Sequence, residues 1–218
     1  MRKMVLVVLV LIAAYAGKVH GQQEDKSKEI LEKVSEKARS FKSIAADFTF
    51  SMENKEMEID EKNDGTIKMK GQKYLVELPN LGVKVFCDGA TIWHYMKDGN
   101  QVTISNIDDE SSELMDPASL FNIYEKGFKS KYIGEKNANG KAVYEIELEP
   151  DSQELDITKV NVLISKADMM IQSAQLFSTD ENIYGIIVKH MDTTKDFPDS
   201  QFVFNAADYP DVEIIDFR

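Results

Sequence analysis

Hydrophobic residues recur at two different spacings along the chain, and the change between them separates the predicted elements. From Ser27 to Phe41 the apolar residues fall on one stripe at helical spacing, with Lys and Glu elsewhere. This pattern predicts an amphipathic helix that lies on an apolar surface. From Phe48 to Ile107 the period is two, as in strands that bury one face. The turn sequences Asn63-Asp64-Gly65, Asp88-Gly89 and Asp98-Gly99-Asn100 separate these strands, and tandem hairpins of this kind predict an antiparallel meander and not β-α-β units.

A second predicted helix interrupts the meander. Asp116 is placed to cap its start, Pro117 suits its first turn and Gly127 ends it. Leu120 and Phe121 belong to an apolar surface that runs nearly all round this short segment. We therefore expect the second helix to be largely buried.

The period of two returns after the second helix and continues to the C-terminus. The strands predicted there are Phe128 to Gly134, Lys141 to Glu149, Ile157 to Ser165, Met169 to Ser178, Ile183 to Met191, Gln201 to Asn205 and Val212 to Phe217. Two helices cover only part of a sheet of about a dozen strands, so the sheet either closes on itself or leaves part of its apolar face as a cavity. A cavity lined by Phe, Met and aliphatic side chains suits acyl chains. The alternative is that the same side chains only pack into a core.

The N-terminal residues have the pattern of a cleavable export signal. Arg2 and Lys3 precede an unbroken apolar run from Val5 to Ala16, and Val19-His20-Gly21 ends in a small residue. The run is shorter than the roughly 20 residues that span a bilayer. We expect cleavage after Gly21, with Ala16 as an alternative, and a single domain over 22–218. Because no cysteine stands at the cleavage point, we do not expect the mature chain to be lipidated.

The charge of the chain restricts its partners. The formal net charge is −12, and the first 21 residues carry three cations and no acid, so the mature chain has −15. Such acidity argues against nucleic acid and anionic headgroups as general partners. The one cysteine, Cys87, excludes an internal disulfide, and we expect its thiol to be buried and inert.

Motifs of catalysis and metal binding do not occur in this sequence. It has no Gly-x-Ser-x-Gly, no His-Glu-x-x-His and no phosphate-binding glycine loop. His94 and His190 are far apart on strand patterns, and we interpret both as structural. Asp108-Asp109-Glu110 lacks the glycine-punctuated spacing of a calcium loop, and we interpret it as a solvated loop. We therefore predict no catalytic residues, no metal and no cofactor.

Several stretches, in the same order, resemble the LolA family, the periplasmic lipoprotein carriers of the Lol system. Asp88-Gly89-Ala90-Thr91-Ile92-Trp93-His94-Tyr95 is similar to the family's Asp-Gly-x-x-Leu-Trp-x-Tyr and is followed by Gln101-Val102. Pro117-x-x-Leu120-Phe121 is similar to its Pro-x-x-Leu-Leu. Phe202-x-Phe204, then Pro210 and the closing segment Val212 to Asp216, resemble its C-terminus, and Phe41-Lys42-Ser43-Ile44-x-x-Asp47-Phe48 fits its opening.

This resemblance implies a mainly β (α+β) fold, an unclosed antiparallel β-barrel around a hydrophobic cavity with a lid of short helices. It also implies a function. The family takes lipoproteins from an inner-membrane ABC-type transporter, shields their acyl chains and delivers them to an acceptor at the outer membrane. We expect this protein to act in the same way as a monomeric periplasmic chaperone, with acylated lipoproteins as cargo.

One stretch departs from the family pattern. The family commonly has Lys-Arg-Pro before the strand that precedes Asp-Gly, and its arginine holds the lid closed. Here the stretch is Lys70-Gly71-Gln72-Lys73-Tyr74. The arginine's role is therefore not carried over, and the lid is either held differently or leaves a more open cavity.

The residues expected to line the cavity are apolar and share strand or helix faces. They are Phe48, Phe50, Ile67, Met69, Trp93, Tyr95, Leu120, Phe121, Ile146 and Leu148. Three other functions stay open. The first is a lipid or glycolipid binder on the same fold, and the second is a sensor of mislocalised lipoprotein that signals to a membrane partner. The third is an enzyme, because a catalytic carboxylate pair would leave no mark in the sequence.

Overall fold

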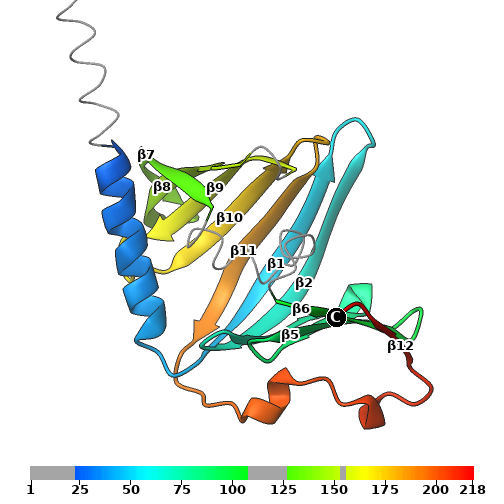
Figure 1. Cartoon of the computed structure of the whole chain (residues 1–218). Helices are drawn as coiled ribbons and strands as arrows, with labels where there is room; N and C mark the ends of the chain where they lie inside the picture. The colour runs from blue at the N-terminus through cyan, green and yellow to red at the C-terminus, as the bar shows by residue number, and fades with distance from the viewer. Residues whose placement is uncertain (1–22, 108–126, 153–155) are drawn as a thin grey trace, which may run out of the picture.

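The structure is a computed structural model that describes residues 23–107, 127–152 and 156–218 (Figure 1). One helix, residues 23–39, precedes a single sheet of twelve strands in the order β12-β6-β5-β4-β3-β2-β1-β11-β10-β9-β8-β7. The strands are β1 (Ile44–Asn54), β2 (Ile59–Lys70), β3 (Lys73–Leu78), β4 (Val83–Cys87), β5 (Thr91–Met96), β6 (Gln101–Asn106), β7 (Phe128–Ala138), β8 (Lys141–Pro150), β9 (Ile157–Ser165), β10 (Ile171–Ser178), β11 (Ile183–Asp192) and β12 (Glu213–Asp216).

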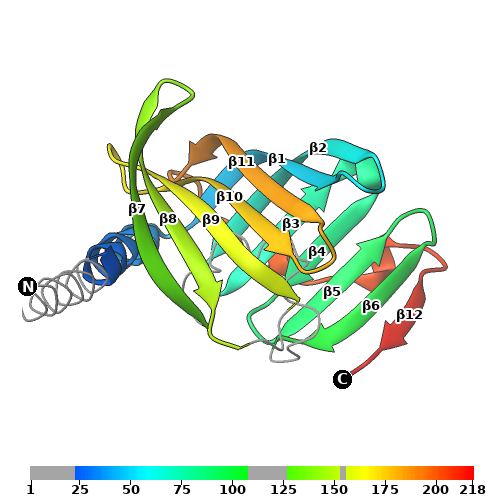
Figure 2. The same ribbon diagram turned by 90° about the horizontal axis from the view of Figure 1, so that it is seen from above.

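The sheet curves strongly without closing. Strands β7 and β12 form its two edges and lie on opposite sides of the molecule in Figure 2. The helix stands along the β7 and β8 side of the curved sheet (Figure 1). This is the unclosed barrel with a helical lid that the family resemblance implies. The predicted second helix, with Leu120 and Phe121, lies outside the described residues, as do the predicted export signal and the Asp108-Asp109-Glu110 loop.

The predicted turn at Asn63-Asp64-Gly65 is wrong. Strand β2 runs unbroken through these residues, and the chain reverses earlier, at residues 55–58, where Glu58 adopts a positive φ of 56°. Gly65 pairs directly with Phe48 of β1. A Cβ atom on Gly65 would lie 2.7 Å from Phe48 Cζ and 2.7 Å from Leu78 Cδ2. The glycine therefore permits close packing within a strand and does not mark a turn.

The C-terminal region differs from its predicted form. The predicted strand at Gln201 to Asn205 is instead a short 3-10 turn, η5 (Asp199–Phe202), and irregular chain, followed by η6 (Ala206–Asp208). These turns belong to a segment, residues 193–212, that crosses the outside of the sheet below β5 and β6 in Figure 1. The closing strand β12 does form, but it pairs with β6 in parallel, whereas the other pairs of described strands are antiparallel.

Apolar side chains pack on both faces of the sheet. On the concave inner face a large cluster joins β1 to β5 with β8 to β11 and includes Ile30, Leu31 and Val34 of the helix. On the convex outer face a second cluster joins β3 to β6 with the C-terminal segment, whose Phe202 is fully buried. Part of the sheet is therefore covered on both sides.

Candidate functional site: an apolar cavity beneath the helix

Antiparallel pairing places the inner-face residues in rows that cross the strands. One row begins at Met191 in β11 and continues through neighbouring strands; its members are Met191, Ala46, Ile67, Val76, Val85, His94 and Thr103. The next row toward the helix end includes Ile44, Met69, Tyr74, Cys87 and Ile92. These rows form the floor of the concave face because paired residues in adjacent strands point to the same side.

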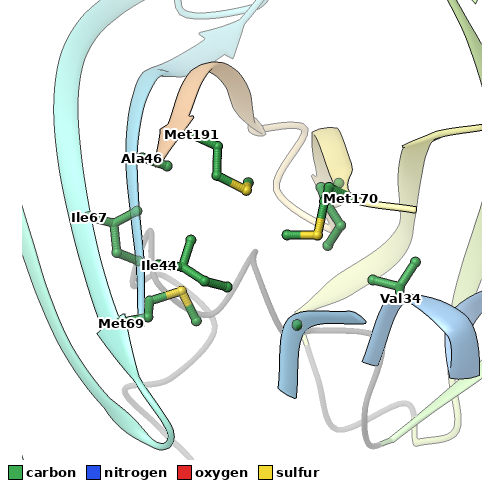
Figure 3. A pocket seen from close by; sticks show the side chains of 9 residues that line it. Val34, Ile44, Ala46, Ile67, Met69, Met170 and Met191 are labelled. Carbon is green, nitrogen blue, oxygen red and sulfur yellow. The ribbon is translucent and has the colours of Figure 1, made fainter. Parts of the chain in front are cut away.

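An apolar pocket lies between this floor and the helix (Figure 3). Its walls come from five parts of the chain, and every lining side chain is apolar: Val34, Ala38, Ile44, Ala46, Ile67, Met69, Met170, Ile171 and Met191. Figure 3 shows Val34 on the helix facing Ile44 and Met69 across the pocket, with Met191 and Met170 above them in this view. Methionine side chains are unbranched and adapt to irregular shapes. The lining therefore offers dispersion contacts and no polar group.

The pocket is small in this structure. Its volume is about 40 Å³, whereas ligand pockets usually measure roughly 300–1,000 Å³. A ligand of any length enters only if the helix moves away from the sheet or the methionines change rotamer. We interpret this small pocket as a collapsed form of the cavity.

The contacts of the helix with β7 include a hydroxyl pair and a cation–π contact near the helix N-terminus. The hydroxyl groups of Ser27 and Ser130 in β7 are 2.7 Å apart and buried. The Lys26 ammonium lies 3.8 Å from the centre of the Tyr132 ring, and the contact with Tyr132 raises the pKa of Lys26. The C-terminal half of the helix supplies Val34 and Ala38, which roof the pocket. The helix therefore has polar contacts with β7 at its N-terminal end and apolar contacts with the pocket at Val34 and Ala38.

Six of the ten residues predicted to line the cavity share the inner face. Phe48, Ile67, Ile146 and Leu148 are fully buried in its cluster, and Phe50 and Met69 pack against it partly exposed. Of these six, Ile67 and Met69 line the pocket itself.

Trp93 and Tyr95 lie on the opposite face, so the prediction that they line the same cavity as Phe48 is wrong. Tyr95 is buried against the C-terminal segment, with its ring centroid 4.4 Å from that of Tyr209, and Trp93 packs against the same cluster. Strand β5 gives no clear alternation because both of its faces are covered, and its larger side chains happen to lie outside. Leu120 and Phe121 fall outside the described residues.

Most of the pocket wall cannot be found by sequence reasoning. Val34 belongs to the predicted stripe of the helix but not to the predicted site, and Met170 and Met191 lie at the ends of β10 and β11. Residues at strand ends meet the helix only through the curvature of the sheet. The sequence offers one signal for this wall, a methionine just before the start of β10 and another near the end of β11.

Lys70 and Lys73, which belong to the stretch where the family has Lys-Arg-Pro, bind the C-terminal segment. Lys70 Nζ lies 2.9 Å from Asp199 Oδ1 and donates a hydrogen bond to the Phe197 carbonyl oxygen, also at 2.9 Å. Lys73 Nζ lies 2.6 Å from Asp199 Oδ2. The hydrogen bond from Lys73, together with that from Lys70, lowers the pKa of Asp199 to about 2. Both lysines therefore fasten the segment to the outer face.

The described residues give no sign of a metal site or a membrane-spanning helix. Within 23–107, 127–152 and 156–218, no three His, Cys, Asp or Glu side chains gather as metal ligands would. No helix in those ranges has the length and apolarity to cross a membrane. Cys87 is buried, as expected for an inert thiol.

Residues 39–205 match the family model described as "Outer membrane lipoprotein carrier protein LolA". The chain belongs to the LolA family. The match begins at the last residue of the helix and ends before η6, so most of the helix and all of β12 lie outside it.

Individual relatives of this LolA-family chain are distant. It is 30% identical over 135 residues to an uncharacterized protein of Methanocaldococcus jannaschii, an alignment that covers 58% of this chain and 37% of that protein. The chain thus matches only about a third of the length of that curated relative. An uncharacterized conserved protein from Thermus thermophilus shares the fold, with a TM-score of 0.57 and 12% sequence identity. The alignment covers 88% of this chain and 99% of that chain. A LolA superfamily protein from Nitrosomonas europaea aligns with a TM-score of 0.46, 12% identity, 82% of this chain and 97% of that chain.

Proposed function

We propose that this protein binds the acyl chains of lipoproteins on the inner face of its open barrel and carries them through the periplasm from the inner to the outer membrane. The observation that carries the proposal is the pocket beneath the helix, whose nine lining side chains are all apolar. The export pattern of residues 1–21 supports a location outside the cytoplasm. An inner-membrane ABC-type transporter would load the protein, and an outer-membrane acceptor would unload it.

The energetics of acyl transfer fit a collapsed pocket. Burying each methylene of an acyl chain contributes about 0.8 kcal/mol, so a chain with a dozen buried methylenes gains roughly 10 kcal/mol. A carrier must offer contact of that order and yet release its load. A cavity that closes when empty recovers apolar contact between the helix and the sheet, which offsets part of the cost of release. No nucleotide-binding motif occurs in the sequence, so energy input would come from the transporter.

The opening movement that we propose is a displacement of the C-terminal half of the helix away from the sheet. Displacement of Val34 and Ala38 would expose the inner-face rows at Ala46 and Ile67, while the Ser27 contact with Ser130 stays in place. The closed and open states would then exchange as cargo binds, each stabilised by apolar burial.

Co-purification tests the proposal directly. The mature protein is expressed in the periplasm of a host that makes triacylated lipoproteins, purified, and its bound molecules are identified by mass spectrometry. Recovery of lipoproteins is the expected result. Phospholipid alone would favour a lipid binder on the same fold. An empty protein that also fails to release lipoproteins from membrane vesicles would refute both functions.

A pair of variants ties the cargo to the pocket. Ala38→Phe places a ring where the helix roofs the pocket, and we expect it to reduce co-purified cargo at least tenfold. Ala142→Phe makes the same chemical change at an exposed site in β8 and serves as the control. Equal cargo in both variants would show that this pocket does not hold the acyl chains.

A further inference from the structure

The inner face is not apolar throughout. In the row that crosses from the pocket, Ala46, Ile67, Val76 and Val85 are all buried and apolar. The next member of the row is His94 in β5. The row that begins in the pocket therefore reaches a titratable side chain on the same face.

The His94 imidazole has an unusual environment. Its Nε2 atom is shielded from solvent and has no hydrogen-bond partner among the described residues. Buried polar atoms in native proteins are almost always hydrogen-bonded, so an unpaired one calls for a specific explanation. Thr103 of β6 lies directly opposite His94 and places a hydroxyl group on the same face. The end of the row is thus polar where its other members are apolar.

The spacing between the pocket and His94 suits an amphiphile. Ile67 in the pocket floor and His94 are three strands apart, which corresponds to roughly 14 Å at the usual strand spacing. A molecule lying across the strands would have its hydrocarbon chain over Ile67, Val76 and Val85 and a polar group at His94. A neutral imidazole offers one donor and one acceptor, so it can donate to a carbonyl oxygen.

We propose that His94 is the polar anchor of the cavity and donates a hydrogen bond to the acyl carbonyl of the bound ligand. This inference rests on the proposed function, because it assumes that the inner face takes acyl chains. The carbonyl is shared by the esters of a glyceride and by the amide of an N-acylated terminus. His94 thereby selects acyl compounds over plain hydrocarbon and fixes how far the chain enters the cavity.

The test compares ligands that differ only at the carbonyl. Methyl dodecanoate, N-methyldodecanamide and dodecyl methyl ether carry chains of similar length, and the ether has no carbonyl group. We expect the mature protein to bind the ester or the amide about tenfold more tightly than the ether, as measured by calorimetry, since that is the usual effect of one buried hydrogen bond. Preference for the ester over the amide points to a glyceride as the source of the carbonyl, and the reverse points to an N-acylated terminus.

Variants at both histidines of the mature chain provide the controls. His94→Leu should bind all three ligands equally and be at least as stable as the parent without ligand, because it removes an unpaired polar atom. His94→Gln, which keeps a donor, should retain part of the preference. His190 is exposed on β11, and His190→Leu should bind like the parent.

The imidazole itself gives an independent readout. In nitrogen-15 spectra of the mature protein, the His94 resonance should shift with the ester or amide and not with the ether, and His190 should not shift at all. Retention of the carbonyl preference by His94→Leu would overturn the anchor and leave acyl binding intact. Failure of the parent to bind any of the three ligands would refute the proposed function and the anchor with it.

Discussion

Gly65 provides a direct test of how the inner face is packed. It lies in the middle of β2, opposite Phe48, with its α-carbon hydrogen directed at the Phe48 ring and the Leu78 side chain. In Gly65→Ala, the new methyl group would lie 2.7 Å from an atom of each side chain and 2.9 Å from the Glu77 carbonyl oxygen. The two side chains are fully or almost fully buried, and the carbonyl belongs to the backbone, so none of the three can withdraw freely.

The expected size of the effect follows from two opposing contributions. Overpacking of a tight core destabilises by about 1–3 kcal/mol. Replacing glycine by alanine restricts the unfolded chain and stabilises by about 0.4–1 kcal/mol. We therefore expect Gly65→Ala to lower the free energy of unfolding by about 1–2 kcal/mol, measured by urea denaturation.

The control is a second glycine within a strand. Gly134 in β7 has nothing within 4 Å of the position that a Cβ atom would take, so Gly134→Ala should change stability by no more than about 0.5 kcal/mol. Phe48→Leu replaces the ring that Gly65 accommodates with a smaller side chain. The double variant Phe48→Leu/Gly65→Ala should be more stable, by about 1 kcal/mol, than the sum of the single effects predicts. Strict additivity, or a Gly65→Ala protein as stable as Gly134→Ala, would refute this account of the packing.

Three further predictions concern the helix and the C-terminal segment. Because the pKa of Asp199 is lowered to about 2 from 3.8, its ion pairs stabilise the fold above about pH 4 and lose this effect as the pH falls toward 2. In thermal unfolding, Asp199→Asn should therefore be less stable than the parent at pH 6, and the difference should disappear near pH 2. A stability difference that is independent of pH would contradict this prediction. Ser27→Ala leaves the Ser130 hydroxyl buried without its partner, so it should increase amide hydrogen exchange in residues 23–39. The double variant Ser27→Ala/Ser130→Ala should recover part of the protection from exchange. Unchanged exchange in Ser27→Ala would show that this contact does not hold the helix. Trp93 packs on the outer face, so its fluorescence spectrum should change in Asp199→Asn at pH 6 and should not change when an acyl ligand binds. A shift of the Trp93 emission at ligand saturation would place this side chain in the cavity.

Period-two alternation is sufficient to predict most of the sheet. Strands that bury one face and expose the other, such as β7 and β8, follow their pattern closely, and Ile146 and Leu148 lie on the predicted side. The chain also reverses within the predicted turn at Asn137 to Gly140, since β7 runs to Ala138 and β8 begins at Lys141. These features depend only on neighbours in the chain.

The predictions that failed depend on partners distant in sequence. Asn63-Asp64-Gly65 has the composition of a turn, but its glycine is required by the ring of Phe48, a long-range contact that local pattern does not reveal. The faces of β5 cannot be told apart from sequence because the C-terminal segment covers the side that holds Trp93 and Tyr95. Phe202 and Phe204 alternate like strand residues, yet both anchor an irregular segment to the sheet.

The parallel strand β12 changes what one edge of the sheet offers to another strand. An unclosed barrel keeps two edges, and an exposed edge is a template for another strand. On one side β12 covers β6 over only four residues, and two of these, Glu213 and Asp216, are exposed acids. On the other side β7 presents the exposed cations Lys129, Lys131 and Lys136. The short β12 and the charged side chains of β7 therefore both limit how far another strand can pair along the open edges of the sheet.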